Sequence, residues 1–174
     1  AIKGDPENAY LNAQLSEVYL RLNNFEKAEI LGEKAVKGEP SNVEYRKSLG
    51  AIYATLKKYP EAKEQYTKIT ELDPTNQTAP LLLGILEAES GDFAKGVEVL
   101  TKTLSENPDN VMALFYRAKV YLEMDQIEKA KTDLDRCLTL RPTFVEAGTA
   151  LGLIYEKTNQ PEEAIKIYSR IRGT

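Results

Sequence analysis

LGAIYATLKKYPEAKEQYTKITELDP, residues 49–74, contains the pattern that decides the fold. It indicates two amphipathic helices joined by a turn at Lys57-Lys58-Tyr59-Pro60, and it ends in a proline. Prolines return every 34 residues, at Pro6, Pro40, Pro74, Pro108 and Pro142. A fixed period of this length is typical of an internal repeat in which each unit is one small set of helices.

The period divides the chain into units of one helix pair each. We predict the end of a preceding unit at 1–8, followed by units at 9–42, 43–76, 77–110, 111–144 and 145–174. The last unit stops four residues short of the full period.

Each unit carries similar residue types at the same positions. A leucine followed by a small residue stands at 15–16, 49–50, 83–84 and 151–152, and a tyrosine follows at Tyr19, Tyr53, Tyr121 and Tyr155. The second half of each unit has a small residue, at Ala28, Ala62, Gly96, Ala130 and Ala164. Spacings of three and four residues place such side chains on one helix face, so we predict that these faces pack helix against helix.

The leucine–glycine–tyrosine set, the later alanine with an aromatic residue four places on, and the closing proline resemble the tetratricopeptide repeat. The resemblance covers the whole chain and implies an all-α, right-handed superhelical solenoid of antiparallel helix pairs. Two positions depart from the pattern. Gly32 stands where a large apolar residue is expected, which predicts loose packing there, and Arg117 replaces the leucine of the fourth unit.

Composition excludes several functional classes. The 174 residues have a net charge of −4 and 29% charged residues, which fits neither a disordered polyelectrolyte nor a nucleic-acid-binding protein. Histidine is absent and Cys137 is the single cysteine, so the sequence argues against catalysis. We also expect neither a metal ion nor a cofactor. There is no apolar run long enough to insert into a membrane, and we expect a soluble chain, cytoplasmic or periplasmic.

The resemblance also implies a concave groove lined by the first helix of every unit. At the family's groove positions, the residues expected to bind a partner are Tyr10, Lys47, Leu81, Ile85, Met112, Phe115, Lys119, Leu122 and Leu153. Apolar side chains interspersed with Glu89, Glu123 and Lys157 suit an amphipathic helix or an extended peptide with hydrophobic anchors. The alternative is that these side chains pack on neighbouring helices and that the groove is merely solvated.

The resemblance favours a scaffold or adaptor that binds a protein or peptide within a multiprotein assembly. A chaperone-tail clamp, which in the family needs asparagine four places after lysine, is missing because Ala51 follows Lys47. The alternative function is a targeting or substrate-selecting domain of a larger enzyme, such as a glycosyltransferase.

The C-terminal end shows no polar helix that would cap the last unit. We therefore expect a segment of a longer array in which Ile167, Tyr168 and Ile171 meet a further element, or self-association through this end. A short array that tolerates a bare end is the alternative.

Overall fold

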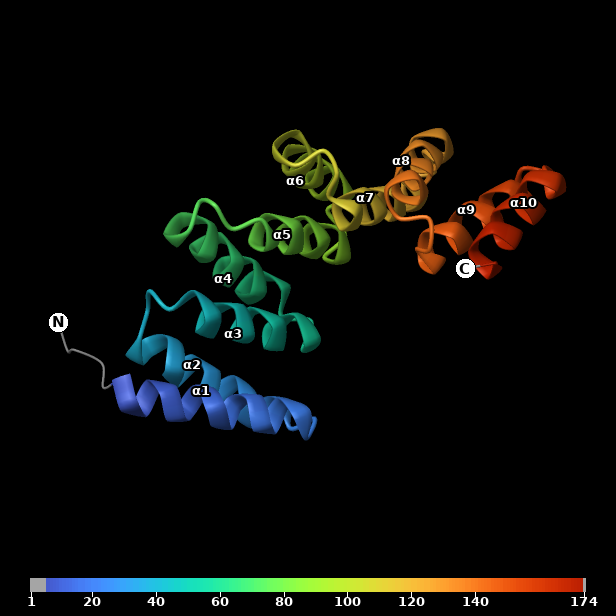
Figure 1. The fold of residues 1–174 in the computed structure, drawn as a ribbon. Coiled ribbons are helices and arrows are strands. Elements are labelled where there is room, and N and C mark those ends of the chain that lie inside the picture. Colours follow the sequence, from blue (N-terminus) through green and yellow to red (C-terminus); the bar gives the residue numbers. More distant parts are fainter. Residues whose placement is uncertain (1–5, 174) are drawn as a thin grey trace. The chain divides into compact units, whose positions relative to one another are not determined.

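The structure is a computed structural model that describes residues 6–173 (Figure 1). Within this range the chain forms ten α-helices and no β-strand, which confirms the prediction of an all-α helical repeat fold. The helices are α1 (Pro6–Arg21), α2 (Phe25–Gly38), α3 (Val43–Thr55), α4 (Tyr59–Leu72), α5 (Thr78–Glu89), α6 (Phe93–Glu106), α7 (Val111–Glu123), α8 (Ile127–Leu140), α9 (Val145–Lys157) and α10 (Pro161–Arg172).

The helices form two compact units, each of which is larger than one predicted repeat. From here on, first and second unit mean these two groups of helices. The first unit ends at Ser90 and contains α1 to α5, and the second begins at Gly91 and contains α6 to α10. In each unit every helix packs against the next one along the chain. The division falls between α5 and α6, inside the predicted repeat 77–110, and the boundaries of the five repeats stay a prediction.

The turns inside the helix pairs share one backbone conformation at one repeat position. A positive φ, between 56° and 93°, occurs at Asn23, Lys57, Gly91, Asp125 and Asn159. Glycine, asparagine and aspartate adopt this left-handed conformation more readily than other residues, because it brings a Cβ close to the backbone. Lys57 is the member of the set whose side chain fits this conformation least well.

Polar caps fix where several helices begin. The side chains of Asn24, Asn42, Asp92 and Asn110 each accept a hydrogen bond from the backbone N–H three residues further on. A cap of this kind satisfies a backbone donor that has no partner inside the helix and contributes about 1 kcal/mol.

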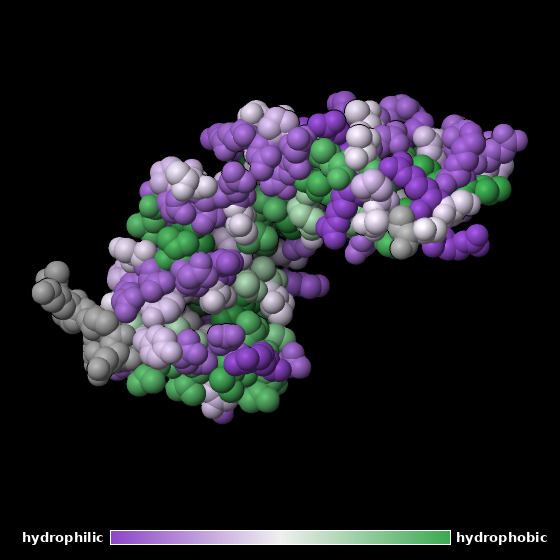
Figure 2. All heavy atoms as spheres, viewed as in Figure 1, coloured by the Kyte–Doolittle hydropathy of each residue, from purple (hydrophilic) through white to green (hydrophobic). Residues whose placement is uncertain are grey.

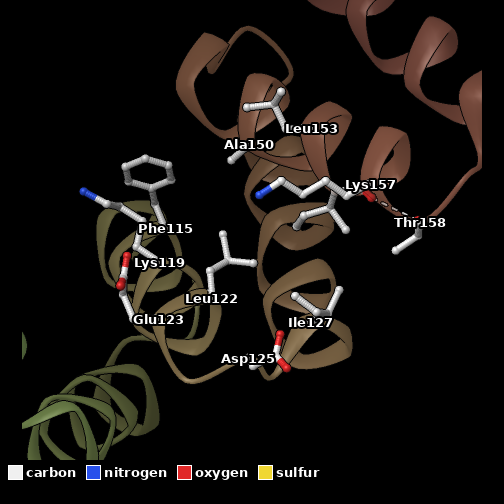
Figure 3. A pocket seen from close by; sticks show the side chains of 11 residues that line it. Phe115, Lys119, Leu122, Glu123, Asp125, Ile127, Ala150, Leu153, Lys157 and Thr158 are labelled. Atoms are coloured by element: carbon white, nitrogen blue, oxygen red, sulfur yellow. Dashed lines mark hydrogen bonds between the residues drawn. The ribbon is translucent and has the colours of Figure 1, made fainter.

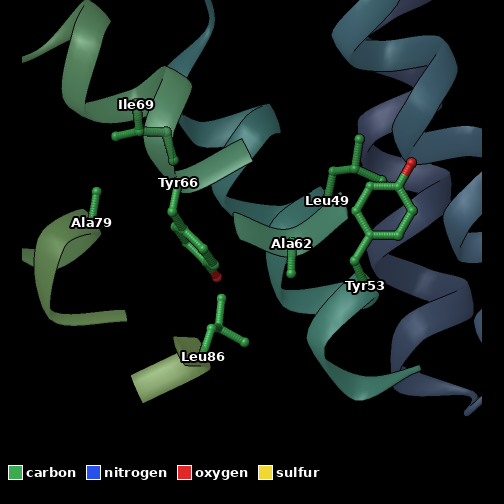
Figure 4. Close-up of a cluster of buried hydrophobic side chains, with 7 residues drawn as sticks. All are labelled: Leu49, Tyr53, Ala62, Tyr66, Ile69, Ala79 and Leu86. Atoms are coloured by element: carbon green, nitrogen blue, oxygen red, sulfur yellow. The ribbon is translucent and has the colours of Figure 1, made fainter. Parts of the chain in front are cut away.

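The core of the first unit consists of the residues that the repeat pattern places on facing helix sides. It is the buried cluster of Leu49, Tyr53, Ala62, Tyr66, Ile69, Ala79 and Leu86 (Figure 4). Gly50 allows a close approach beside it, because a Cβ added to Gly50 would lie 3.0 Å from the Tyr66 ring and the ring would have to shift. Burial of each large apolar side chain contributes roughly 1.5 to 3 kcal/mol.

The second unit has an equivalent core. Its fully buried large side chains are Leu100, Leu134, Cys137, Leu138 and Leu151. The contact of α9 with α10 again depends on glycine, since a Cβ on Gly152 would collide with the Tyr168 ring and one on Gly148 with Ile171.

The prediction of loose packing at Gly32 is wrong. A Cβ added there would lie 3.2 Å from Leu49 Cδ1 and 3.3 Å from Ser16 Oγ, so the neighbouring side chains have closed around the glycine. Ser16 is itself held in place, because its Oγ donates a 2.6 Å hydrogen bond to the backbone oxygen of Ala28.

Arg117, which replaces the expected leucine, forms an ion pair between α7 and α8. Its Nε and Nη2 donate to Asp133 Oδ2 and Oδ1 at 2.8 and 2.7 Å. Asp133 is 4% exposed, and the bidentate pair raises the pKa of the Arg117 guanidinium. The leucine contact is therefore replaced by a partly desolvated charge pair whose hydrogen bonds are satisfied.

The two ends differ in part from expectation. Helix α1 begins at Pro6, and residues 1–5, where most of the end of a preceding unit was expected, lie outside the described residues. At the other end, Tyr168 and Ile171 make their contacts with α9, over Gly152 and Gly148, while Ile167 is half-buried.

Candidate functional site

A cavity of about 600 Å³ lies in the second unit between α7, the start of α8 and α9 (Figure 3). We call it the α7–α9 cavity, and its lining consists of Phe115, Lys119, Leu122, Glu123, Asp125, Ile127, Ala150, Leu153, Ile154, Lys157 and Thr158. The lining residues of α7 follow one another at four, three and one residues, and the four lining residues of α9 at three, one and three. Each set therefore occupies one side of its helix.

The floor of the cavity is apolar. Phe115 and Leu122 are half-buried, and Leu153 of the facing helix is 46% exposed. These side chains keep solvent contact, so they offer apolar surface that an added molecule would cover.

Neighbouring rings hold the Phe115 side chain. Its centroid lies 5.0 Å from that of Phe144 and 5.6 Å from that of Tyr116, at interplanar angles of 54° and 68°. Phe144 is buried and stands at the start of α9, so this aromatic contact ties α7 to α9 next to the cavity. Tilted and edge-to-face arrangements of this kind are favourable for aromatic pairs.

Charged groups of both signs surround the apolar floor. Lys119 Nζ lies 6.0 Å from the Phe115 centroid and 5.4 Å from that of Tyr116. Glu123, Asp125 and Lys157 are exposed. Over residues 6–173, neither lysine forms an ion pair, so both ammonium groups are available to an acidic group on a bound molecule.

The structure places four of the nine predicted binding residues around this cavity. Phe115, Lys119, Leu122 and Leu153 line it. Met112 lies on α7, is 37% exposed and is not part of the lining. Four residues belong to the first unit, with Tyr10 on α1, Lys47 on α3, and Leu81 and Ile85 on α5.

Sequence reasoning missed part of the lining. Asp125 and Ile127 belong to the turn and start of α8, outside the first helices on which the predicted groove was based. Ala150, Ile154 and Thr158 also lie off the chosen repeat positions. The repeat position of Asp125, between the two expected helices of its repeat, was the available signal in the sequence.

No group of three or more cysteine, aspartate and glutamate side chains could hold a metal ion within residues 6–173. Cys137 is fully buried, and burial, with the nearby Asp133 carboxylate, raises its thiol pKa to about 12. The thiol is therefore protonated at neutral pH and closed off from substrates.

None of the helices between residues 6 and 173 has both the length and the apolar character needed to cross a membrane.

Solved structures with the same fold cover nearly all of the chain. A MamA protein shares 24% identity over 95% of this chain and 90% of that chain, with a TM-score of 0.77. PilF of Pseudomonas aeruginosa gives 20% identity, coverages of 96% and 76%, and a TM-score of 0.79. YrrB is described as a tetratricopeptide repeat protein with an unusual peptide-binding site. It shares 17% identity over 92% of this chain and 82% of that chain, with a TM-score of 0.65. At these identities the likeness establishes the fold alone.

Comparison with curated protein sequences gave no match. Three sequence families described as tetratricopeptide repeat match consecutive parts of the chain, at residues 13–77, 87–136 and 146–171. Together with the helix pairs, the turn positions and the fold of the solved structures, these matches mean that the chain belongs to the tetratricopeptide repeat family.

Proposed function

We propose that this chain is a protein-interaction scaffold and that its α7–α9 cavity binds a short helix or extended segment of a partner protein. The observation that carries the proposal is the partly exposed apolar surface of Phe115, Leu122 and Leu153 around one cavity. Arrays of this family are interaction scaffolds in general, and YrrB is described as having a peptide-binding site.

The cavity suggests what the partner segment carries. Its volume of about 600 Å³ falls within the usual range for binding sites and suits one or two large apolar side chains. Lys119 and Lys157 favour an acidic group beside these anchors, while Glu123 and Asp125 disfavour one near the α7–α8 turn. We therefore expect a segment with hydrophobic anchors and an acidic group on the side of the two lysines.

The remaining predicted residues extend the same proposal. Tyr10, Lys47, Leu81, Ile85 and Met112 are each at least partly solvent-accessible, which supports a role in contacting further parts of a partner. The role is binding and not catalysis, within a multiprotein assembly. A targeting domain of a larger enzyme would use the same cavity and differ in the catalytic domain attached to it.

Self-association through the C-terminal helix is also part of the proposal. It is supported by Ile165 of α10, which is 64% exposed.

The test is selection of peptides from a displayed random library on immobilised protein. We expect the unmodified chain to enrich peptides with paired hydrophobic anchors and nearby acidic residues. Phe115→Glu should abolish this enrichment, because it places a carboxylate on the apolar floor. Binding of one enriched peptide, measured by fluorescence polarisation, should weaken by about tenfold or more.

Val145→Glu is the matched control, since Val145 is 52% exposed and lies on α9 outside the cavity lining. It introduces the same charge and should leave peptide binding unchanged. Circular dichroism should show both variants folded. Equal loss in both variants, or retained binding in a folded Phe115→Glu protein, would contradict the cavity as the binding site.

A further inference from the structure

An apolar stripe runs along α1 and into the turn that follows it. It consists of Leu11, Leu15, Val18 and Leu22, which are between 42% and 68% exposed. Their spacing of four, three and four residues places them on one helix face. Figure 2 shows hydrophobic surface at the lower edge of the first unit, where α1 lies. We call these four residues the α1 stripe.

The position of Val18 is buried in each of the other first helices. At steps of 34 residues it corresponds to Ile52, Leu86, Val120 and Ile154, which are between 1% and 4% exposed. Each of these residues lies on a helix that packs against the second helix of a preceding pair. The α1 stripe therefore has the composition of a covered face, and a contiguous exposed apolar patch of this kind marks an interaction site.

The contact of α4 with α5 shows what such a cover consists of. Tyr66 of α4 lies in one buried cluster with Ala79 and Leu86 of α5 (Figure 4). The same ring closes over Gly50, and at the edge of the contact Lys63 Nζ pairs with Glu87 Oε2 at 2.8 Å.

The pair α9–α10 carries the same covering residues three repeats later. Leu49, Tyr53, Ala62, Tyr66 and Ile69 correspond to Leu151, Tyr155, Ala164, Tyr168 and Ile171, an identical set. Tyr168 closes over Gly152 as Tyr66 closes over Gly50. Yet Tyr168 is only half-buried where Tyr66 is 3% exposed, because in the described part of the chain α10 has no following helix to cover.

We propose that the α1 stripe of one copy of this chain docks on α9–α10 of a second copy, in the register in which α5 docks on α3–α4. This contact rests on the self-association proposed above and specifies both of its surfaces. In this register Val18 meets the Tyr168 ring as Leu86 meets Tyr66. Leu11 takes the place of Ala79, at the repeat position where α3 carries the larger Tyr45.

The edge of the contact supports this pairing over a contact with an unrelated helix. Ile165 occupies the repeat position of Lys63, and Tyr19 occupies that of Glu87. Both members of the lysine–glutamate pair are thus replaced, and an apolar side chain faces a ring. In the contact of α8 with α9 the same two repeat positions carry Lys131 and Tyr155, and Lys131 Nζ lies 5.1 Å from the Tyr155 centroid.

The proposed contact is heterologous, because α1 of one copy meets α10 of another. Each complex therefore keeps one unused α1 stripe and one unused α10 surface, and association continues beyond the dimer or closes into a ring. A symmetric dimer through α1 alone, or through α10 alone, would stop at two copies.

Two variants test the contact, each blocking one surface. Val18→Glu charges the α1 stripe and Ile165→Glu charges α10, and both side chains are exposed enough for the change to leave the fold intact. Sedimentation velocity should show the unmodified chain growing in mass with concentration. Each variant alone should stay at 19.5 kDa, with association weakened by about tenfold or more. An equimolar mixture should form a one-to-one complex, since it combines an intact α10 with an intact α1 stripe.

Ile30→Glu is the control, because Ile30 of α2 is 53% exposed and lies outside both surfaces. It should associate like the unmodified chain. A mixture that stays monomeric, or a Val18→Glu protein that associates normally, overturns this contact while self-association by another surface survives. A strictly monomeric unmodified chain overturns both, and peptide selection on the α7–α9 cavity is unaffected by either result.

Discussion

At the scale of single residues, the turn position shared by the helix pairs has a measurable energetic consequence. Lys57 has a φ of 57° where the other members are asparagine, aspartate or glycine. A side chain with a Cβ in this conformation costs about 1 to 2 kcal/mol, and glycine recovers most of that cost while adding some freedom to the unfolded chain.

We therefore expect Lys57→Gly to raise the free energy of unfolding by about 0.5 to 1 kcal/mol. Urea denaturation followed by circular dichroism measures the change. Gly91→Ala, at the equivalent position with a φ of 93°, should lower the stability. A shift of the unfolding midpoint in the same direction by both substitutions would contradict this expectation.

At the scale of helices, the ion pair between α7 and α8 determines how the fourth repeat tolerates change. Arg117 and Asp133 satisfy each other in a place where the second and fifth repeats have Leu49 and Leu151 at the position of Arg117. Removal of one member leaves the other partly buried without its partner, whereas replacement of both by apolar residues removes the desolvation cost as well.

Arg117→Leu should accordingly destabilise the protein by about 2 to 4 kcal/mol, although it restores the typical residue of the repeat. The double variant Arg117→Leu with Asp133→Val should recover most of this loss, since valine is the residue at the equivalent position 99. Thermal and urea denaturation of the two single variants and the double variant give the coupling energy. Additive losses would show that the pair is not coupled.

The helices themselves were predictable, and the use of individual positions was less so. The proline period and the leucine–glycine–tyrosine set specify where the helices lie, because they reflect contacts made in nearly every pair. The exposure of Leu15 was not predictable from its repeat position, because the equivalent Leu49 is covered by α2: Leu15 is 49% exposed and Leu49 is 2% exposed. The cavity was partly predictable. Phe115 and Leu122 stand at repeat positions that the family uses for its groove, whereas Asp125 and Ile127 lie in the turn after α7 and at the start of α8.

At the scale of the whole molecule, the two proposed contacts use different surfaces and should be separable. Phe115→Glu alters the α7–α9 cavity, and Val18→Glu alters the α1 stripe. The first variant should lose peptide binding and still associate, and the second should bind peptide as a monomer. Coupled loss of both activities in either variant would mean that one surface depends on the other.

Association should also stabilise the folded chain by mass action. A tenfold rise in protein concentration should raise the thermal midpoint of the unmodified chain by about 2 to 4 °C. Val18→Glu, which cannot present the α1 stripe, should show a midpoint that is independent of concentration. Differential scanning calorimetry over two decades of concentration measures the difference, and parallel behaviour of the two proteins would count against it.

The match between α3–α4 and α9–α10 bears on how such a chain can change its length. Because the five residues that receive α5 are present again on the last pair, a gene segment encoding α5 to α10 could be duplicated in frame after Arg172, with the native 73–77 connector, and would meet a prepared junction. Growth by steps of three repeats then reuses the apolar part of this junction, and Glu87 would meet Ile165 in place of Lys63. Insertion between α7 and α8 would instead separate Arg117 from Asp133. The chain thus contains both a permissive point and a forbidden point for recombination.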